Sequence, residues 1–84
     1  MKEIRWNLEK NAILKKTRGV TFEELMESRF LGIERHRGRE NQDLMVFEYK
    51  QYAWVIPYVE EGNVFFLKTA FPSRKHTRDY LGDV

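Results

Sequence analysis

The stretch from residue 64 to residue 78 constrains the fold most, because an apolar run changes there into a cluster of positive charge. Its first part, residues 64–71, is rich in aromatic and aliphatic side chains and predicts a buried strand. Pro72 cannot donate a ladder hydrogen bond and is expected to end that strand. Ser73 is a good helix N-cap, so a short helix is predicted from Arg74 onward.

This predicted helix carries three permanent cations and a histidine within five residues. A fixed cluster of that kind suits a polyanion better than a metal ion or a hydride carrier. The cations are Arg74, Lys75 and Arg78, and the histidine is His76. From the density of charge alone, a solvated basic helix turn without any ligand is an equally good interpretation.

The composition sets limits on the class of protein. A chain of 84 residues is predicted to form one domain, residues 1–84, which is too small to enclose a large cofactor. Its 42% hydrophobic and 33% charged residues are typical of a folded, soluble globule. The absence of cysteine excludes disulfides, thiolate zinc sites and a cysteine nucleophile. Two histidines cannot form a closed zinc site without carboxylates, so we expect no metal and no cofactor.

The charge is distributed unevenly along the chain, although the net charge is only +2. Residues 1–18 and 68–84 are basic, whereas residues 19–67 are acidic. If the two ends meet in space, they form one positive surface, which favours nucleic acid as a partner. No apolar run approaches the roughly 20 residues that span a bilayer, and the first residues lack a signal-peptide core. We therefore expect a cytoplasmic protein that does not contact a membrane.

A strand and a helix are predicted at the beginning of the chain. Ile4 and Trp6 alternate with polar residues, which indicates a short strand with one buried face. Asn7 is a suitable N-cap for a helix over residues 8–17, which is rich in good helix formers. Gly19 can adopt the left-handed conformation that ends helices.

A second helix and an edge strand follow. Thr21 and Glu24 fit a capping box, so this helix is predicted to start at about Phe22, and it is expected to fade near residues 31–32. Residues 33–43 are polar and charged, which indicates a short edge strand that runs into an exposed loop.

Three strands are predicted next, over residues 44–49, 52–59 and 64–71. The connection at residues 60–63 contains the glycine of a typical hairpin turn, whereas the connection near residues 50–51 does not. Pro57 removes a ladder hydrogen bond, so a bulge or an unpaired position is expected there. Because the helices precede the antiparallel strands, the sequence predicts an α+β domain in which helices cover one face of the sheet.

Two groups of residues, taken in register, resemble the BrnT family, the toxins of bacterial type II toxin–antitoxin pairs. The first group is Trp6-Asn7, Glu9-Lys10-Asn11, Leu14-Lys15 and Arg18-Gly19-Val20-Thr21-Phe22-Glu23. The second group is Phe66-Leu67-Lys68-Thr69, Pro72-Ser73-Arg74-Lys75 and Thr77. The resemblance covers most of the chain and is poorest in the middle loop.

The resemblance implies a fold like that of RelE toxins: an N-terminal strand and two helices packed on an antiparallel sheet, with a short C-terminal helix. It also implies ribonuclease activity and neutralisation by a ribbon-helix-helix antitoxin, through which alone the toxin would contact operator DNA. The sequence departs from the commoner family ending, which has alanine in place of His76 and glutamate in place of Tyr80. A catalytic role of that glutamate in relatives would not carry over to this chain.

Metal-independent RNA cleavage requires deprotonation of the ribose 2′-hydroxyl, stabilisation of the phosphorane and protonation of the leaving oxygen. Arg74 is our first candidate for the phosphate contact, with Lys75 and Arg78 beside it. His76 is the candidate acid–base group because histidine titrates near neutrality, although an ordinary surface histidine is the competing interpretation.

The remaining candidates come from the matched motifs and from the predicted sheet. Lys10 and Tyr80 complete the predicted catalytic residues, and the predicted RNA-binding residues are Lys15, Arg18, Tyr52, Lys68 and Arg78. The predicted function is therefore a metal-independent endoribonuclease toxin that acts on RNA. The alternative is a non-catalytic RNA- or protein-binding module that uses the same basic face.

Overall fold

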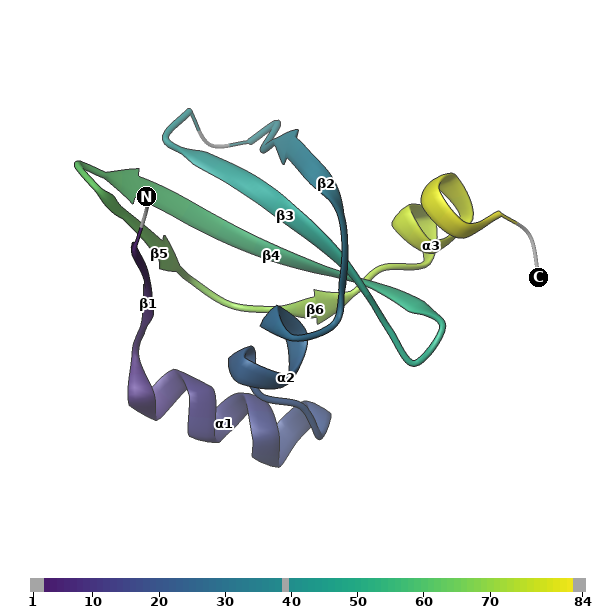
Figure 1. The fold of residues 1–84 in the computed structure, drawn as a ribbon, viewed down its shortest axis with the longest axis horizontal. Coiled ribbons are helices and arrows are strands. Elements are labelled where there is room, and N and C mark those ends of the chain that lie inside the picture. Colours follow the sequence, from purple (N-terminus) through teal and green to yellow (C-terminus); the bar gives the residue numbers. More distant parts are fainter. Residues whose placement is uncertain (1–2, 39, 83–84) are drawn as a thin grey trace.

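The computed structural model describes residues 3–38 and 40–82, which form an α+β fold around one sheet (Figure 1). The first elements are β1 (Glu3–Trp6), α1 (Leu8–Arg18) and α2 (Phe22–Met26). They are followed by β2 (Arg29–Arg35), β3 (Gln42–Tyr49) and β4 (Tyr52–Glu61). The last elements are β5 (Val64–Leu67), β6 (Phe71–Pro72) and α3 (Arg74–Leu81). The predicted fold class is confirmed, and none of the helices in this part of the chain is long and apolar enough to cross a membrane.

The sheet is mainly antiparallel. Its strand order is β1-β5-β4-β3-β2, and the short β6 pairs with β4 beyond the end of β5. Among the described strand pairs, only β1 and β5 run parallel. Parallel strands need a long connection, and here it consists of α1, α2 and the strands β2 to β4. The two outer strands of this order are therefore β1 and β2.

Strand β1 forms where predicted, but its buried face is incomplete. The Trp6 ring packs against the ring of Phe22, with 5.7 Å between the centroids. Ile4 remains 41% exposed, because β1 is an outer strand and has a neighbour on one side only.

Helix α1 is confirmed together with both of its caps. The Asn7 side chain accepts a hydrogen bond from the Lys10 N–H at 3.0 Å. Gly19 ends the helix with φ 79°, a left-handed conformation that glycine adopts without strain. Leu14 is buried against the sheet, whereas Leu8 is 79% exposed, so the helix has only a narrow apolar face.

Helix α2 begins where the capping box predicts but is shorter than expected. Thr21 Oγ1 accepts from the Glu24 N–H at 3.1 Å, and Glu24 Oε1 accepts from the Thr21 N–H at 2.9 Å. The helix ends at Met26 and does not continue to residues 31–32. The reason is tertiary: residues 29–35 form a ladder with β3, interrupted by one bulge, and this ladder replaces the helical hydrogen bonds.

Strand β2 is an outer strand, as predicted, but it begins at Arg29. Its register with β3 shifts between Phe30 and Gly32, so one extra residue lies in β2. Because of this bulge, Phe30 and Ile33 share the face of Phe47 and Met45, whereas Gly32 and Glu34 face the other side with Val46 and Leu44. The bulge thus sets the direction of the Glu34 side chain.

The turn between β3 and β4 has an unusual backbone for its sequence. Lys50 and Gln51 both have positive φ, 52° and 67°, and they connect Tyr49 directly to its partner Tyr52. Such a two-residue turn matches the twist of the flanking strands and is usually built from asparagine and glycine. The predicted turn at residues 60–63 also forms, with Gly62 at φ 58°.

Pro57 causes no bulge, and it is unpaired, as expected, only on the side of β4 that faces β5 and β6. It pairs with Leu44 within an unbroken β3–β4 register. On the other side of β4, pairing with β5 reaches Tyr58, and pairing with β6 begins at Val55. The Pro57 carbonyl accepts from the Lys68 N–H at 2.8 Å across this break, so the missing N–H lies where no strand needs it.

The predicted strand over residues 64–71 is divided in two. β5 ends at Leu67, and residues 68–70 have no regular structure before β6 begins. Leu67 and Ala70 are fully buried, which explains the apolar pattern, but Phe66 is only half-buried. The helix after Pro72 forms as predicted, and Ser73 Oγ caps it by accepting from the His76 N–H at 3.1 Å.

Helices cover both faces of the sheet. α1 and α2 pack on the face that contains the main core, which includes Phe22, Leu25, Phe47, Ile56 and Leu67. α3 contacts β4 and β2 on the opposite face, where Tyr80 lies over Gly32 and the Thr77 hydroxyl accepts from the Ala53 N–H at 2.9 Å. Figure 1 shows α1 and α2 below the sheet and α3 to its right.

Candidate functional site

A hydrogen-bonded cluster joins α3 to β2. The Glu34 carboxylate has one partner on each oxygen: Oε2 accepts from the Tyr80 hydroxyl at 2.6 Å, and Oε1 lies 3.1 Å from His76 Nε2. The His76 and Tyr80 rings are stacked, with 6.3 Å between their centroids and 14° between their planes. Both side chains therefore approach Glu34 from the same face of α3, one helical turn apart.

The second ring nitrogen of His76 also has a partner. Nδ1 lies 2.7 Å from Ser73 Oγ, the atom that caps α3. The His76 side chain is only 12% exposed, so it is not the ordinary surface histidine of the competing interpretation. The candidate acid–base group is thus held at both nitrogens.

The electrostatics of this cluster favour a charged Glu34 and a neutral Tyr80. The hydrogen bond to Glu34, assisted by burial and by the negative charge of the carboxylate, raises the pKa of Tyr80 to about 12. The hydrogen bond from Tyr80 is the main cause that lowers the pKa of Glu34, and His76 and Lys75 act in the same direction against the effect of burial. Glu34 is therefore an acceptor at neutral pH, and Tyr80 is a donor and not a base.

The predicted phosphate-binding cations lie on the same helix. Arg74, Lys75 and Arg78 are all exposed on α3, close in sequence to the capped end that holds His76. α3 therefore presents three positive side chains to solvent next to a histidine that is fixed by Glu34 and Ser73. Phosphate groups are the anions that such arginine and lysine side chains bind best.

A second group of predicted residues lines a hollow of about 330 Å³ beside α1. Its positive residues are Lys10 and Arg18 from α1 and Lys68 from the segment after β5. The Lys68 ammonium also lies over the Phe66 ring, 5.5 Å from the centroid. The hollow is lined by Lys10, Ile13, Leu14, Thr17, Arg18, Phe22, Lys68 and Thr69. We call it the α1 hollow.

Arg18 connects this hollow to a smaller one of about 260 Å³ at the β3–β4 turn, where Tyr52 and Lys50 are also found. Tyr52 is half-buried and lines this second hollow. Lys15, by contrast, points to the acidic α2, with its ammonium 3.2 Å from Glu24 Oε1. Its charge is partly balanced within the protein.

The expectation that the two basic ends form one positive surface is wrong for α3, although Lys68 of the C-terminal basic segment lines the α1 hollow with Lys10 and Arg18. The α1 hollow lies beside the helix that covers the main core, whereas α3 packs on the opposite face of the sheet through Gly32 and Glu34. β6 follows β4 beyond the end of β5, and Ser73 donates to the Ala53 carbonyl at 2.9 Å, so α3 begins beside the first residues of β4. Lys10 and Arg74 therefore belong to two separate cationic areas.

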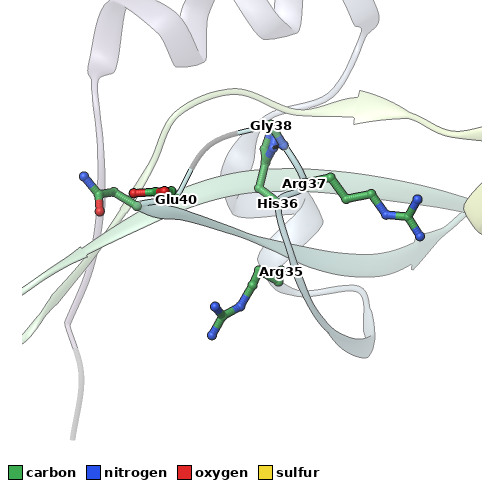
Figure 2. Close-up of a pocket in the computed structure, with 6 residues that line it drawn as sticks. Arg35, His36, Arg37, Gly38 and Glu40 are labelled. Carbon is green, nitrogen blue, oxygen red and sulfur yellow. Dashed lines mark hydrogen bonds between the residues drawn. The ribbon is translucent and has the colours of Figure 1, made fainter.

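A hollow of about 850 Å³ lies at the β2–β3 connection and is a weaker candidate. Figure 2 shows that the side chains of Arg35 and Arg37 point away from each other, so their guanidinium groups do not converge on one ligand position. His36 Nδ1 accepts from the Gly38 N–H at 3.0 Å, which stabilises the turn itself. Within residues 3–38 and 40–82, no three His, Cys, Asp or Glu side chains are grouped so that they could hold a metal ion.

Sequence reasoning missed Glu34, because it lies in the polar segment interpreted as an edge strand and loop. It is separated from His76 by 42 residues and from Tyr80 by 46, so no local spacing connects them. One signal was present: His76 and Tyr80, the two departures from the commoner family ending, are the residues that bind Glu34.

No family model and no curated protein sequence matches this chain. The crystal structure of the Brucella abortus ribonuclease toxin BrnT is similar over 87% of this chain and 97% of that chain, with a TM-score of 0.59 and 10% sequence identity. The two folds are thus similar over most of their length, although few residues are shared. The chain has the fold of the BrnT ribonuclease toxin.

Proposed function

We propose that residues 1–84 act as one toxin domain, a cytoplasmic endoribonuclease of a type II toxin–antitoxin pair that a ribbon-helix-helix antitoxin neutralises. The observation that carries this proposal is α3, where a histidine held by Glu34 and Ser73 stands beside three exposed cations. The fold shared with a ribonuclease toxin supports the same assignment. Operator DNA would be contacted only through the antitoxin.

The reaction assigned to α3 is cleavage by the neighbouring 2′-hydroxyl. His76 takes the proton of that hydroxyl as general base, the O2′–P bond forms, and the P–O5′ bond breaks. Arg74 and Lys75, with Arg78 beside them, stabilise the negative charge of the phosphorane. The leaving O5′ takes a proton from water, and the imidazolium then returns its proton to the hydroxide that remains. Tyr80, predicted as catalytic, supports this centre through its hydrogen bond to Glu34.

The α1 hollow is assigned to binding of the RNA away from the scissile bond. Arg18 and Lys68 would contact backbone phosphates there, and Tyr52 offers a ring for stacking in the adjoining hollow. Lys10, predicted as catalytic, is proposed to bind RNA with them, because it lies on the other face of the sheet from His76. Lys15 contributes less, since Glu24 balances its charge.

The decisive experiment is incubation of the purified protein with 5′-labelled RNA in the presence of EDTA. The proposal requires fragments that end in a 2′,3′-cyclic phosphate, because the 2′-hydroxyl is the attacking group. Arg74→Ala should lower the rate by about 10²-fold or more, as removal of a transition-state charge partner typically does. Arg37→Ala, which removes an exposed arginine outside α3, is the matched control and should cleave at the wild-type rate. Circular dichroism of both variants shows whether the fold is intact.

A non-catalytic RNA-binding module is the second candidate, and the position of the α1 hollow favours it. The hollow gathers three cations without a histidine among its lining residues. Such a module would give a salt-sensitive shifted band with RNA and no product. In cells, the toxin proposal requires growth arrest by the wild type, relief by Arg74→Ala and relief by co-expression of a ribbon-helix-helix antitoxin. Continued growth with the wild type would exclude a toxin.

A further inference from the structure

Glu34 is the residue through which β2 controls the orientation of the His76 ring. Its side chain leaves the sheet on the α3 side because of the bulge between Phe30 and Gly32. Its two oxygens bind residues 76 and 80, so the carboxylate cannot rotate without losing one of the two hydrogen bonds. The Tyr80 ring lies nearly parallel to the imidazole, with 14° between the two planes. Three elements, β2, α3 and the Ser73 cap, thus fix a single side chain.

The chemistry of the partners decides which nitrogen of His76 can exchange a proton. A carboxylate that accepts from Tyr80 and carries a negative charge can only accept at Oε1, so Nε2 must carry hydrogen whether the ring is neutral or charged. The charged or titratable groups around His76 are Glu34 on β2 and Lys75, Asp79 and Tyr80 on α3. The nitrogen that gains or loses a proton is therefore Nδ1.

Nδ1 is next to the Ser73 hydroxyl, 2.7 Å away. Ser73 Oγ already accepts from the His76 N–H, so its own hydrogen is available to Nδ1 when the ring is neutral. Ser73 directly precedes Arg74 and Lys75, the proposed phosphate ligands. A phosphate held by those cations would lie near the Ser73 hydroxyl, which makes this hydroxyl the natural path between Nδ1 and the substrate.

We propose that Glu34 is a positioning residue that holds the Nε2–H of His76 and so makes Nδ1 the proton-exchanging nitrogen, with the Ser73 hydroxyl as its link to the RNA. This inference rests on the proposed function. Ser73 gives its proton to Nδ1 and takes the proton of the 2′-hydroxyl, so its own protonation state is unchanged after the step. This arrangement has the logic of a base oriented by a third group, with the substrate hydroxyl as nucleophile.

Glu34→Gln tests this inference, since it keeps the shape of the side chain and removes the charge that fixes Nε2–H. The ¹⁵N shifts of the imidazole nitrogens in free protein should show a single Nε2–H tautomer for His76 in the wild type and a mixture in the variant. The cleavage rate should fall about tenfold or more, a part of the 10²–10⁴-fold that general acid–base catalysis contributes. Ser73→Thr, which keeps the hydroxyl, should cleave faster than Ser73→Gly, which keeps only the backbone of the cap.

Two controls separate this inference from a merely structural effect. Glu48→Gln removes a β3 carboxylate on the same sheet face, which binds Arg29 at 3.1 Å, and should leave both the His76 signals and the rate unchanged. His36 accepts from Gly38 at Nδ1 and provides an internal reference that Glu34→Gln should not shift. If the wild type cleaves RNA and Glu34→Gln cleaves equally fast, or keeps the pure tautomer, the inference is wrong while the proposed function stands. If the wild type gives no product, the proposed function fails and the inference fails with it.

Discussion

Asn11 and Glu23 join α1 to the first turn of α2 through a hydrogen bond of 2.6 Å between the Asn11 amide and Glu23 Oε1. The other end of the same side chain, Asn11 Oδ1, accepts from the Phe22 N–H at 2.8 Å. Asn11 is buried, and its bond is the main cause that lowers the pKa of Glu23. One polar side chain thus satisfies an N–H at the start of a helix that has no partner within the helix.

Asn11→Ala should therefore lower the free energy of unfolding by about 1–3 kcal/mol, because it leaves the buried Phe22 N–H without a partner. Urea denaturation followed by circular dichroism measures this difference. Asn41→Ala, at an exposed asparagine, is the control and should change the free energy by less than about 0.5 kcal/mol. An equally small change for Asn11→Ala would show that water replaces the amide.

The hydrogen bond between Tyr80 and Glu34 should make stability depend on pH at both ends of the range. Tyr80 has a raised pKa of about 12, so its contribution to the free energy of unfolding is complete below pH 10.0, its ordinary pKa. This contribution is lost as the pH rises through about 12. Glu34 has a lowered pKa, so its contribution is complete above the ordinary 4.5 and is lost as pH falls through the lowered value. The difference in unfolding free energy between wild type and Tyr80→Phe should be largest between these limits and should shrink outside them. A difference that is constant with pH would refute the coupling.

The turn at Lys50 and Gln51 should be open to stabilisation. The left-handed backbone at Lys50 and Gln51 costs a non-glycine residue about 1–2 kcal/mol, which a glycine would not lose. Part of the stability gained by a glycine substitution is offset by the greater freedom of glycine in the unfolded chain. Gln51→Gly should therefore raise the unfolding free energy by about 0.5–1 kcal/mol. Gly62→Ala, where φ is also positive and nothing lies near the added carbon, should change it by a similar amount in the opposite direction. Urea midpoints that move the other way would count against this account of the turn.

Local signals predicted the helices better than they predicted where strands would begin. The capping box of Thr21 and Glu24 and the Asn7 cap depend on neighbours three residues apart, so the sequence alone contains them. The end of α2 at Met26 depends on pairing between β2 and β3, which no local pattern records. The division between β5 and β6 likewise follows from a change of partner along β4.

The candidate site was predictable only on α3. Cations within five residues can be recognised from spacing, and Ser73 indicates the helix that carries them. The partner of His76 lies on another strand, and the face on which Glu34 points is set by a one-residue bulge, so its role required the structure. Charge counting had placed Lys10 and Arg74 together, but they are separate because α1 and α3 pack on opposite faces of the sheet, which no local pattern records.

Lys68 should contribute to RNA affinity through one phosphate contact, because it lines the α1 hollow and holds its ammonium over the Phe66 ring. For single-stranded RNA, each such contact lowers the slope of log K against log salt by about 0.7. Lys68→Gln should therefore weaken binding at low salt and make the slope less steep by about that amount. Lys16→Gln, at an exposed lysine of α1 that does not line the hollow, is the matched control and should keep the wild-type slope. Fluorescence anisotropy with labelled RNA across a salt series measures both. Because the hollow and α3 lie on different faces, the cleavage rate at saturating protein should stay the same in Lys68→Gln, and a loss of rate there would place Lys68 with the reacting phosphate.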